Sequence, residues 1–456
     1  MSLANLLQPV ITNGIRNTNF FNGRLATAED FGTEQTANRQ RQQQLGKAIG
    51  EGVVDGLEVT KSASSVAFGQ QVVHVTAGTA INRNGDVVRL GIDTDVALVP
   101  AGQQSPADAG LFAECMPPQV NFTNPGAYVL TIMPASGFEE RVPITSLTSG
   151  GLATGCGSKY ATEGVKFRLT QLQLGSEISG LRGEMRTLAN QIETQLNQNA
   201  DPATIAPLLS RFRNGMAHLC LGTEDLAGYA ADPFAFLNNP SAYTSYGLVD
   251  ELRDAGLLND CEVPLALLYW TRAGVQFVDL WSVRRPVTPP SAAGEWSPLL
   301  GTRRVAESLS SFLQFESQIE SLLGAGLGQA TLSTARASDY FRFLPPVGFL
   351  PVTGTNSSTG FNPQTFFDVH ASKDVATTDG DLLRELFHKG LYHEPIDLVN
   401  PGKIQLYLIW ENLQVVQQGN TTQLALVFAS PAIPYRGIAR FGTAKWSLSR
   451  FAPRVI

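Results

Sequence analysis

The residues best suited to metal chemistry lie between positions 368 and 397. His393-Glu394 begins like the His-Glu-x-x-His motif of zinc proteases, but Asp397 stands where the second histidine should be. Asp368 and His370 could join Glu394 and Asp397 around a metal ion, because carboxylates and imidazole are common metal ligands. Polar side chains around turns account for the same residues, and we favour that interpretation. The sequence therefore predicts no metal site, no cofactor and no catalytic residue here.

Other catalytic motifs are incomplete. Gly150 and Gly155 have the outer spacing of a phosphate-binding loop, but Cys156 replaces the lysine that would contact phosphate. Glu139-Glu140 is the best carboxylate pair, but neighbouring residues of a strand point to opposite faces, so the two groups cannot share one substrate. The nucleophile motif Gly-x-Ser-x-Gly does not occur in the sequence. We therefore expect no enzyme, and an unrecognised hydrolase is the least favoured of three hypotheses.

Two aromatic clusters in the C-terminal half favour a second hypothesis, a module that binds glycans or other surfaces. They are Tyr340-Phe341-Arg342-Phe343 and the segment 361–367. Exposed rings would offer flat apolar surfaces to a ligand. Aromatic residues at such spacing more often belong to a hydrophobic core, which is the alternative interpretation.

Charged residues are scarce in this chain. They make up 16% of it, against about 25% in an average soluble domain. The formal net charge is -7 and the densest basic cluster is Arg39-Gln40-Arg41, which argues against nucleic acid as a principal ligand. A weakly charged surface rich in amides and hydroxyls suits permanent burial against other proteins, because full charges are costly to desolvate. An uncharged soluble monomer is the alternative.

The four cysteines give no clear framework. Cys115, Cys156, Cys220 and Cys261 contain no Cys-x-x-Cys pair, so they fit neither a zinc site nor a small disulfide scaffold. Ordinary buried thiols in a reducing compartment are the default expectation, with one or two disulfides left open. The N-terminus lacks the pattern of a signal peptide, and no apolar run reaches the length of a membrane span. We expect cytoplasmic synthesis and no direct membrane span.

The N-terminal part is predicted to be an extended arm followed by a polar helix. Thr27 can cap a helix that runs to about Ile49, and Asp30 completes a pattern like a capping box. From Glu34 to Gln44 this helix is almost wholly polar. Such a helix cannot be buried along its length in its own domain. It therefore lies on a surface or packs through its amides against a partner.

Local patterns further along the chain predict both strands and helices. Asn84-Gly85 favours a type I′ β-hairpin. Residues 100–160 are expected to be rich in loops around one strand at 128–132. A helix at about 304–323 is predicted by apolar residues at helical spacing. The residues expected to face inward from it are Leu309, Phe312, Ile319 and Leu323.

Together these patterns predict a multidomain α+β fold. We expect β-rich N- and C-terminal domains with a helical-hairpin insertion in the middle. The expected divisions are the arm and polar helix at 1–55, a small β domain at 56–110, a central α+β domain at 111–290 with the helical hairpin near 176–220, and a mainly β domain at 291–456.

Three blocks of the sequence resemble a known class of proteins. The first is NFFNGRLATAEDF at 19–31, followed by the polar helix and by GVVDGLEV at 52–59. The second is VPLALL at 263–268 with VDLWSVRR at 278–285, and the third is FLPPVGFLP at 343–351. This set resembles proteins encoded beside the baseplate components of contractile, phage-tail-like injection systems.

The resemblance implies a structural, non-enzymatic part of such a particle, in the baseplate, an extended baseplate or a fibre-attachment layer. The expected partners are other baseplate, sheath or fibre proteins. By analogy with tail baseplates, a homo-oligomer with three- or six-fold symmetry is expected. After cytoplasmic synthesis the chain would enter a tail-like particle, either released by lysis or anchored to a membrane through other components.

The first two blocks contain the residues that we expect at an assembly interface. Phe20-Phe21 can anchor in a neighbour's groove or staple the arm onto its own helix near Phe31. Arg24 can pair with Glu29 or Asp30, and Arg284-Arg285 can contact a partner's carboxylate or end a solvated strand. The full candidate set is Phe20, Phe21, Asn22, Gly23, Arg24, Leu25, Glu29, Asp30, Phe31, Trp281, Arg284 and Arg285.

Overall fold

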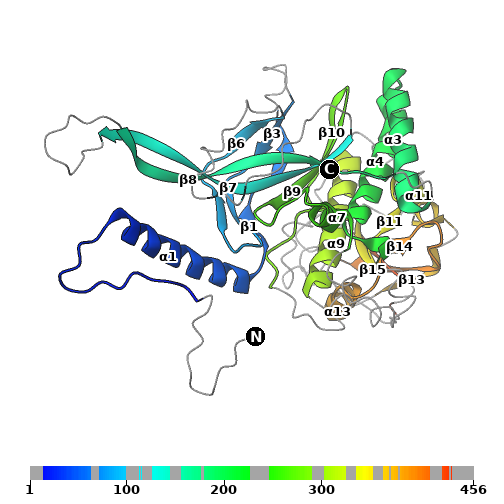
Figure 1. Cartoon of the computed structure of the whole chain (residues 1–456). Helices are drawn as coiled ribbons and strands as arrows, with labels where there is room; N and C mark the ends of the chain where they lie inside the picture. The colour runs from blue at the N-terminus through cyan, green and yellow to red at the C-terminus, as the bar shows by residue number, and fades with distance from the viewer. Residues whose placement is uncertain are drawn as a thin grey trace, which may run out of the picture.

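The computed structural model describes residues 14–62, 71–98, 112, 115, 126–143, 156–175, 179–225, 246–289, 302–324, 335–352, 363–368, 371–377, 380–410, 424–430 and 433. Helices and several small sheets alternate along the chain, as Figure 1 shows. The predicted multidomain α+β fold is confirmed. None of the helices in the described ranges combines the length and the apolar character that crossing a bilayer requires.

Helix α1 (Ala28–Ile49) and two small antiparallel sheets form the N-terminal part. One sheet has the order β1-β4-β5, with β1 at Gly52–Gly56, β4 at Gly78–Ile81 and β5 at Val87–Leu90. The other has the order β2-β3-β6, with β2 at Val59–Lys61, β3 at Val72–Val75 and β6 at Thr94–Ala97.

The β4–β5 hairpin forms where it was predicted, but its turn is not type I′. Asn84 is not among the residues with positive φ, whereas Gly85 has φ +83°. The Gly85 N–H donates to the Asn82 carbonyl, and the Asn82 N–H donates to the Asp86 carbonyl. This is a three-residue loop closed by a left-handed glycine, a common alternative to the two-residue turn.

A four-stranded antiparallel sheet forms the centre of the molecule, in the order β10-β9-β7-β8. Its strands are β7 (Gly126–Pro143), β8 (Cys156–Gln171), β9 (Val263–Thr271) and β10 (Gly274–Asp279). The two faces of this sheet pack into two different hydrophobic cores. Val129 and Leu267 pack with helices, while Leu130 and Leu268 pack with the small N-terminal sheets. The helices on that first face are α3 (Gly180–Asn197), α4 (Pro202–Cys220) and α7 (Leu248–Asp254). The predicted helical hairpin, α3 with α4, is therefore present.

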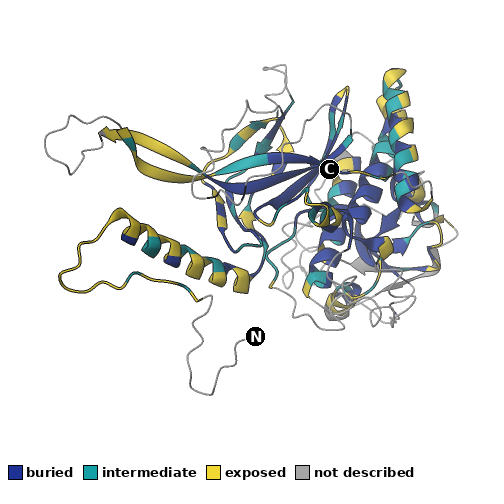
Figure 2. Ribbon diagram, viewed as in Figure 1, coloured by how far each residue is buried: buried dark blue, intermediate teal, exposed yellow. Residues whose placement is uncertain are grey.

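Strands β7 and β8 continue past the sheet as a two-stranded ribbon. Strand β9 pairs with β7 only as far as Ile132, whereas β8 accompanies β7 to Pro143. The ribbon projects from the body in Figure 1 and is exposed on both sides in Figure 2. The expectation of loops around one short strand was wrong here, because strands exposed on both faces lack the alternation that identifies a half-buried strand.

The C-terminal part is built around helix α9 (Thr302–Gly324) and a mixed sheet in the order β12-β16-β15-β13. These strands are β12 (Val347–Val352), β16 (Leu424–Ala429), β15 (Ile404–Trp410) and β13 (Ala371–Thr377), and only the β13–β15 pair is parallel. The remaining elements are α11 (Ala337–Tyr340), β11 (Phe343–Leu344), α12 (Pro363–Phe366), α13 (Gly380–Gly390) and β14 (Ile396–Asp397).

The inward face of α9 differs from the predicted one. Ile319 is buried as expected, but Leu309 is 37% exposed, and the side chain of Leu323 lies outside the described residues. Gln314 and Gln318 are buried instead. They are accommodated because α4 and the end of β10 supply hydrogen-bond partners, which hydrophobic periodicity cannot reveal.

Candidate assembly interface

The start of α1 is fixed by the predicted capping box. The Thr27 hydroxyl accepts a hydrogen bond from the Asp30 N–H, and the Asp30 carboxylate accepts one from the Thr27 N–H at 3.0 Å. Arg24 forms an ion pair with Asp30. The Thr27 backbone N–H is the main cause of a lowered pKa of Asp30, to which the Thr27 hydroxyl and Arg24 add. Asp30 therefore stays ionised and holds the turn Phe21–Arg24 against the helix.

The arm folds back along α1 as far as Arg41. The Thr18 hydroxyl donates to the Asp30 carbonyl at 2.8 Å, and Arg41 donates to the Asn17 side chain at 2.8 Å. Ala37 lies beneath this side of the helix and is fully buried. The arm is thus positioned by its own chain before any partner binds.

The predicted contact between Phe20 and Phe31 is present, with ring centroids 6.4 Å apart, but it buries neither ring. Phe20 stays 53% exposed and Phe31 58%. Phe21 and Leu25, which follow Phe20 in the arm, are 63% and 87% exposed. We call these four side chains, Phe20, Phe21, Leu25 and Phe31, the apolar tip. Clustered exposed apolar side chains of this size are typical of protein interaction sites.

The second half of α1 packs on the β4–β5 turn, and we call this contact the seat of α1. A Cβ on Gly46 would lie 2.1 Å from the Gly85 carbonyl oxygen, so the two backbones touch directly. Asp86 in the turn accepts a hydrogen bond from Gln43 at 2.8 Å and pairs with Arg39 at 3.4 Å. The contacts among these residues were not predicted from the sequence. A glycine late in a polar helix was the available signal, because it marks a close backbone approach.

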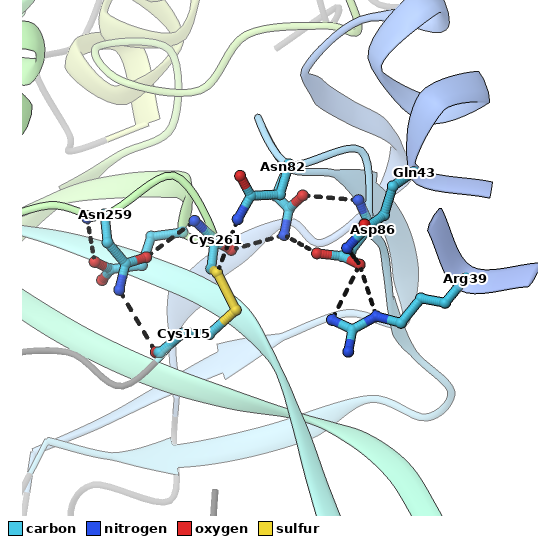
Figure 3. The surroundings of a disulfide bond; sticks show 9 residues. Arg39, Gln43, Asn82, Asp86, Cys115, Asn259 and Cys261 are labelled. Carbon is cyan, nitrogen blue, oxygen red and sulfur yellow. Dashed lines mark hydrogen bonds and ion pairs between the residues drawn. A yellow bond between two sulfur atoms is a disulfide. The ribbon is translucent and has the colours of Figure 1, made fainter. Parts of the chain in front are cut away.

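A disulfide lies beside the seat of α1. The default expectation of ordinary buried thiols is therefore wrong for two of the four cysteines. Cys115 and Cys261 are bonded, with their Cα atoms 5.5 Å apart. Figure 3 shows how the bond joins the polar contacts under α1: Asn82 donates to the Cys261 carbonyl and to Asp86. Cys156 is an exposed free thiol and Cys220 a buried one. The pairing was not predictable from spacing, because 146 residues separate the two cysteines.

The segment pinned by the disulfide also contacts α1. Phe112, packed with Cys115 and Cys261, lies under the Arg39 guanidinium, 4.2 Å from the ring centroid to Cζ. Burial and cation–π attraction both favour this contact. The helix therefore rests on the hairpin turn and on a residue held near it by the disulfide.

Arg284 and Arg285 are used within the chain. Arg284 is buried and donates to the carbonyls of Gly56 and Leu57 at 2.6 and 2.7 Å. The alternative of a solvated strand end is therefore wrong for Arg284, since its guanidinium holds the left-handed turn at Gly56-Leu57. Arg285 donates to the carbonyls of Trp281 and Ser282.

The two groups of candidate residues are not brought together. The backbone next to Arg285 pairs with the chain just after α1, as in the Glu51–Thr288 bridge. The apolar tip is at the opposite end of α1, whose 22 residues span about 33 Å. Only the tip presents large apolar groups to solvent, so it is the stronger candidate of the two.

The candidate metal residues do not form a site in the described part of the chain. Arg342 donates to both carboxylate oxygens of Asp397, and Asp368 lies 4.0 Å from Arg336. Burial raises the pKa of Glu394. His370, Gly150 and Gly155 lie outside the described residues. No group of three or more His, Cys, Asp or Glu in the described ranges is placed to hold a metal ion.

The aromatic clusters belong to the core wherever they are described. Phe341 and Phe343 are 0% and 4% exposed, and Phe366 and Phe367 are 2% and 3% exposed. Phe341 packs against Phe315, Phe367 against Phe428 and Phe343 against His218. These buried rings therefore offer no flat surface to a glycan. Phe361 lies outside the described residues.

The chain was also compared with known proteins. It matches no protein-family model, and it has no significant match among curated proteins.

Proposed function

We propose that this protein is a non-enzymatic structural component of a contractile, phage-tail-like injection system, in the baseplate, an extended baseplate or a fibre-attachment layer. The observation that carries the proposal is the apolar tip on α1. It coincides with the first and most specific of the sequence blocks that resemble such components.

The tip is built in a way that favours tight docking. Its turn is held by the Arg24–Asp30 ion pair and the capping box, so little conformational entropy remains to be lost when a partner binds. Aromatic side chains that fill a partner's pocket commonly dominate the energy of an interface. Figure 2 shows the outer side of α1 and the arm exposed beside a largely buried body.

The partners we propose are other baseplate, sheath or fibre proteins, in a three- or six-fold arrangement around the tail axis. The chain would be made in the cytoplasm and then enter the particle. The low content of charged residues supports this role, because a surface with few charges loses little hydration energy when it is buried.

The test is whether the chain travels with particles. High-mass particles pelleted from a native lysate should contain it by mass spectrometry and appear as tubes with a baseplate by negative-stain microscopy. The variant Leu25→Ser should leave the protein folded and soluble but absent from the pellet, because it removes an 87% exposed apolar group from the tip.

The matched control is Ile92→Ser, which removes a 75% exposed apolar group from outside α1 and should leave incorporation unchanged. If native protein stays in the supernatant while such particles pellet without it, the proposed role is wrong. If Leu25→Ser enters particles as well as Ile92→Ser does, the tip is not the docking element.

A further inference from the structure

The β7–β8 ribbon presents a regular backbone edge to solvent along β8. Among the described strands β8 pairs with β7 alone, so the groups on the other edge of β8 meet no strand within the ribbon. The residues from Ser158 to Gly164 are all exposed, and Figure 2 shows this part of the ribbon exposed on both faces. None of the residues of β8, all of which are described, has positive φ. An extended edge of this kind is a template for a further strand.

The outer edge of β7 is less suited to pairing. Beyond Ile132 it too meets no further strand in the described part of the chain. However, Glu140 has φ +53°, a left-handed conformation that interrupts the extended backbone. Such irregularities commonly protect exposed edges from pairing. The ribbon therefore has one regular edge, that of β8.

We propose that β8 pairs with β8 of a second copy of this chain, antiparallel about a two-fold axis at Ala161. Lys159 then lies directly opposite Glu163 of the second copy, and the symmetry repeats this pair on the other side of the axis. Opposite charges at directly facing positions stabilise an antiparallel pair. The two ribbons would form one four-stranded sheet with β8 of each copy in its middle.

Charge complementarity argues for a second copy as the occupant and fixes the register. Within the ribbon Glu163 lies opposite Ser136, which carries no charge. Lys159 donates to Glu140 at 2.8 Å, and an ammonium group has further donors for Glu163 of the second copy. Any other register separates Lys159 from Glu163. Lys166 also lies on β8, but it is half-buried and has contacts within its own chain.

The apolar side chains of the ribbon fit the same register. Phe138 is 59% exposed and lies opposite Ala161, the residue on the axis. Two small alanine side chains at the axis leave room for the Phe138 ring of each copy to cover them. Val142 is 40% exposed and lies opposite Gly157, which would face Val165 of the second copy. Pairing therefore covers apolar surface as well as backbone groups.

This contact is independent of the apolar tip, since it uses no residue of α1 or of the arm. A two-fold contact closes on itself and gives a dimer, so it does not by itself build a ring of three or six. The inference therefore stands whether or not the chain enters a particle.

Disulfide cross-linking of the full chain tests the register. A Cys156→Ser background removes the exposed thiol. With Ala161→Cys the introduced thiols of the two copies lie opposite each other, with Cβ atoms about 4.5–5.5 Å apart. We expect a covalent dimer after mild oxidation, seen by gel electrophoresis without reductant. Thr162→Cys is the matched control: its equivalent in the second copy lies diagonally, about 7–8 Å away, so cross-linking should be about tenfold slower.

Charge reversal in the same background tests the pairs. The mass of each variant is measured over a range of concentrations by light scattering or sedimentation, and we expect a monomer–dimer equilibrium. Glu163→Lys should weaken it at least about tenfold, because it sets like charges opposite each other twice. Adding Lys159→Glu should restore it, because the double variant exchanges the members of each pair. Glu139→Lys, the same change at an exposed site of β7, faces no charge of the second copy and should leave dimerisation unchanged.

Three outcomes overturn the proposal. One is a protein that stays monomeric at every concentration. Another is equal cross-linking by Ala161→Cys and Thr162→Cys, which would place the axis elsewhere. The last is equal weakening by Glu163→Lys and Glu139→Lys, or a double variant that dimerises no better than Glu163→Lys alone.

Discussion

Helices α1 and α9 are nearly equal in length, with 22 and 23 residues. They differ in whether their amide side chains are exposed or buried. In α9, Gln314 and Gln318 are 0% and 1% exposed and bond to groups of α4 and to Asp279 at the end of β10. In α1, Gln35, Asn38 and Gln42 face solvent. Polarity alone therefore does not decide whether a helix is buried. The decisive factor is whether the chain supplies partners for the polar groups.

The first prediction concerns the buried polar groups that anchor α9, where we expect the greatest loss of stability. Asp279 is fully buried and accepts hydrogen bonds from Gln314 and Ser282 while paired with Arg213. Asp279→Ala leaves the Arg213 charge buried without its carboxylate and should lower the free energy of unfolding by about 3–5 kcal/mol. Denaturant titration followed by circular dichroism measures this loss.

The control for this variant is Glu140→Ala, which removes the 60% exposed partner of Lys159 on the ribbon. We expect a change of at most about 1 kcal/mol, because exposed ion pairs contribute little. Equal effects of the two variants would show that α9 is not anchored by its polar groups.

The next prediction concerns the disulfide beside the seat of α1. Cys115→Ser removes a cross-link that spans 146 residues and should lower the free energy of unfolding by about 2–4 kcal/mol. It should also free Phe112 from beneath Arg39, so amide exchange in the second half of α1 should quicken while that of α9 stays slow. Cys156→Ser, at an exposed free thiol, should do neither.

A third prediction concerns a carboxyl of α9. Burial raises the pKa of Glu316 from 4.5 to about 8, although a hydrogen bond from the Phe349 N–H opposes this shift. Because the folded pKa exceeds the unfolded value, the contribution of Glu316 to stability is present below about pH 4.5 and is lost as pH rises towards 8.

Replacing this carboxyl with an amide removes its titration. As pH rises from 5 to 8, the free energy of unfolding of Glu316→Gln should therefore increase relative to that of the native protein, by up to about 1 kcal/mol per pH unit. Glu385→Gln, at a half-exposed carboxyl of α13, should show no such trend. Parallel stability curves for the native protein and Glu316→Gln would contradict the prediction.

How much the sequence revealed depended on the distance between the interacting residues. The start and end of α1, its capping box and the Phe20–Phe31 contact were predictable because they involve neighbours within about twelve residues. The Cys115–Cys261 bond and the contact of Gln318 with Ser210, 108 residues away, were not. Spacing and periodicity carry no information about which distant segments meet.

The same limit applies to the candidate interface. The residues of the tip were identified from a local pattern, and their exposure was then found in the structure. The burial of Arg284 depends on the turn at Gly56-Leu57, more than 200 residues away, and could not be foreseen.

The last prediction concerns the contact between the exposed helix α1 and the β4–β5 turn, where we expect only a small loss of stability. Gly85 has φ +83°, and a Cβ there would lie 2.0 Å from the Gln43 carbonyl oxygen of α1. Gly85→Ala should therefore lift the helix from its turn, at a cost of about 1 kcal/mol in global stability. Amide exchange should rise in the second half of α1 and remain unchanged in α9. The control is Gly91→Ala, where a Cβ meets nothing within 4 Å. Gly85→Ala could instead destabilise α9 as much as α1. The two helices would then belong to one cooperative unit, and α1 would not unfold locally on its own.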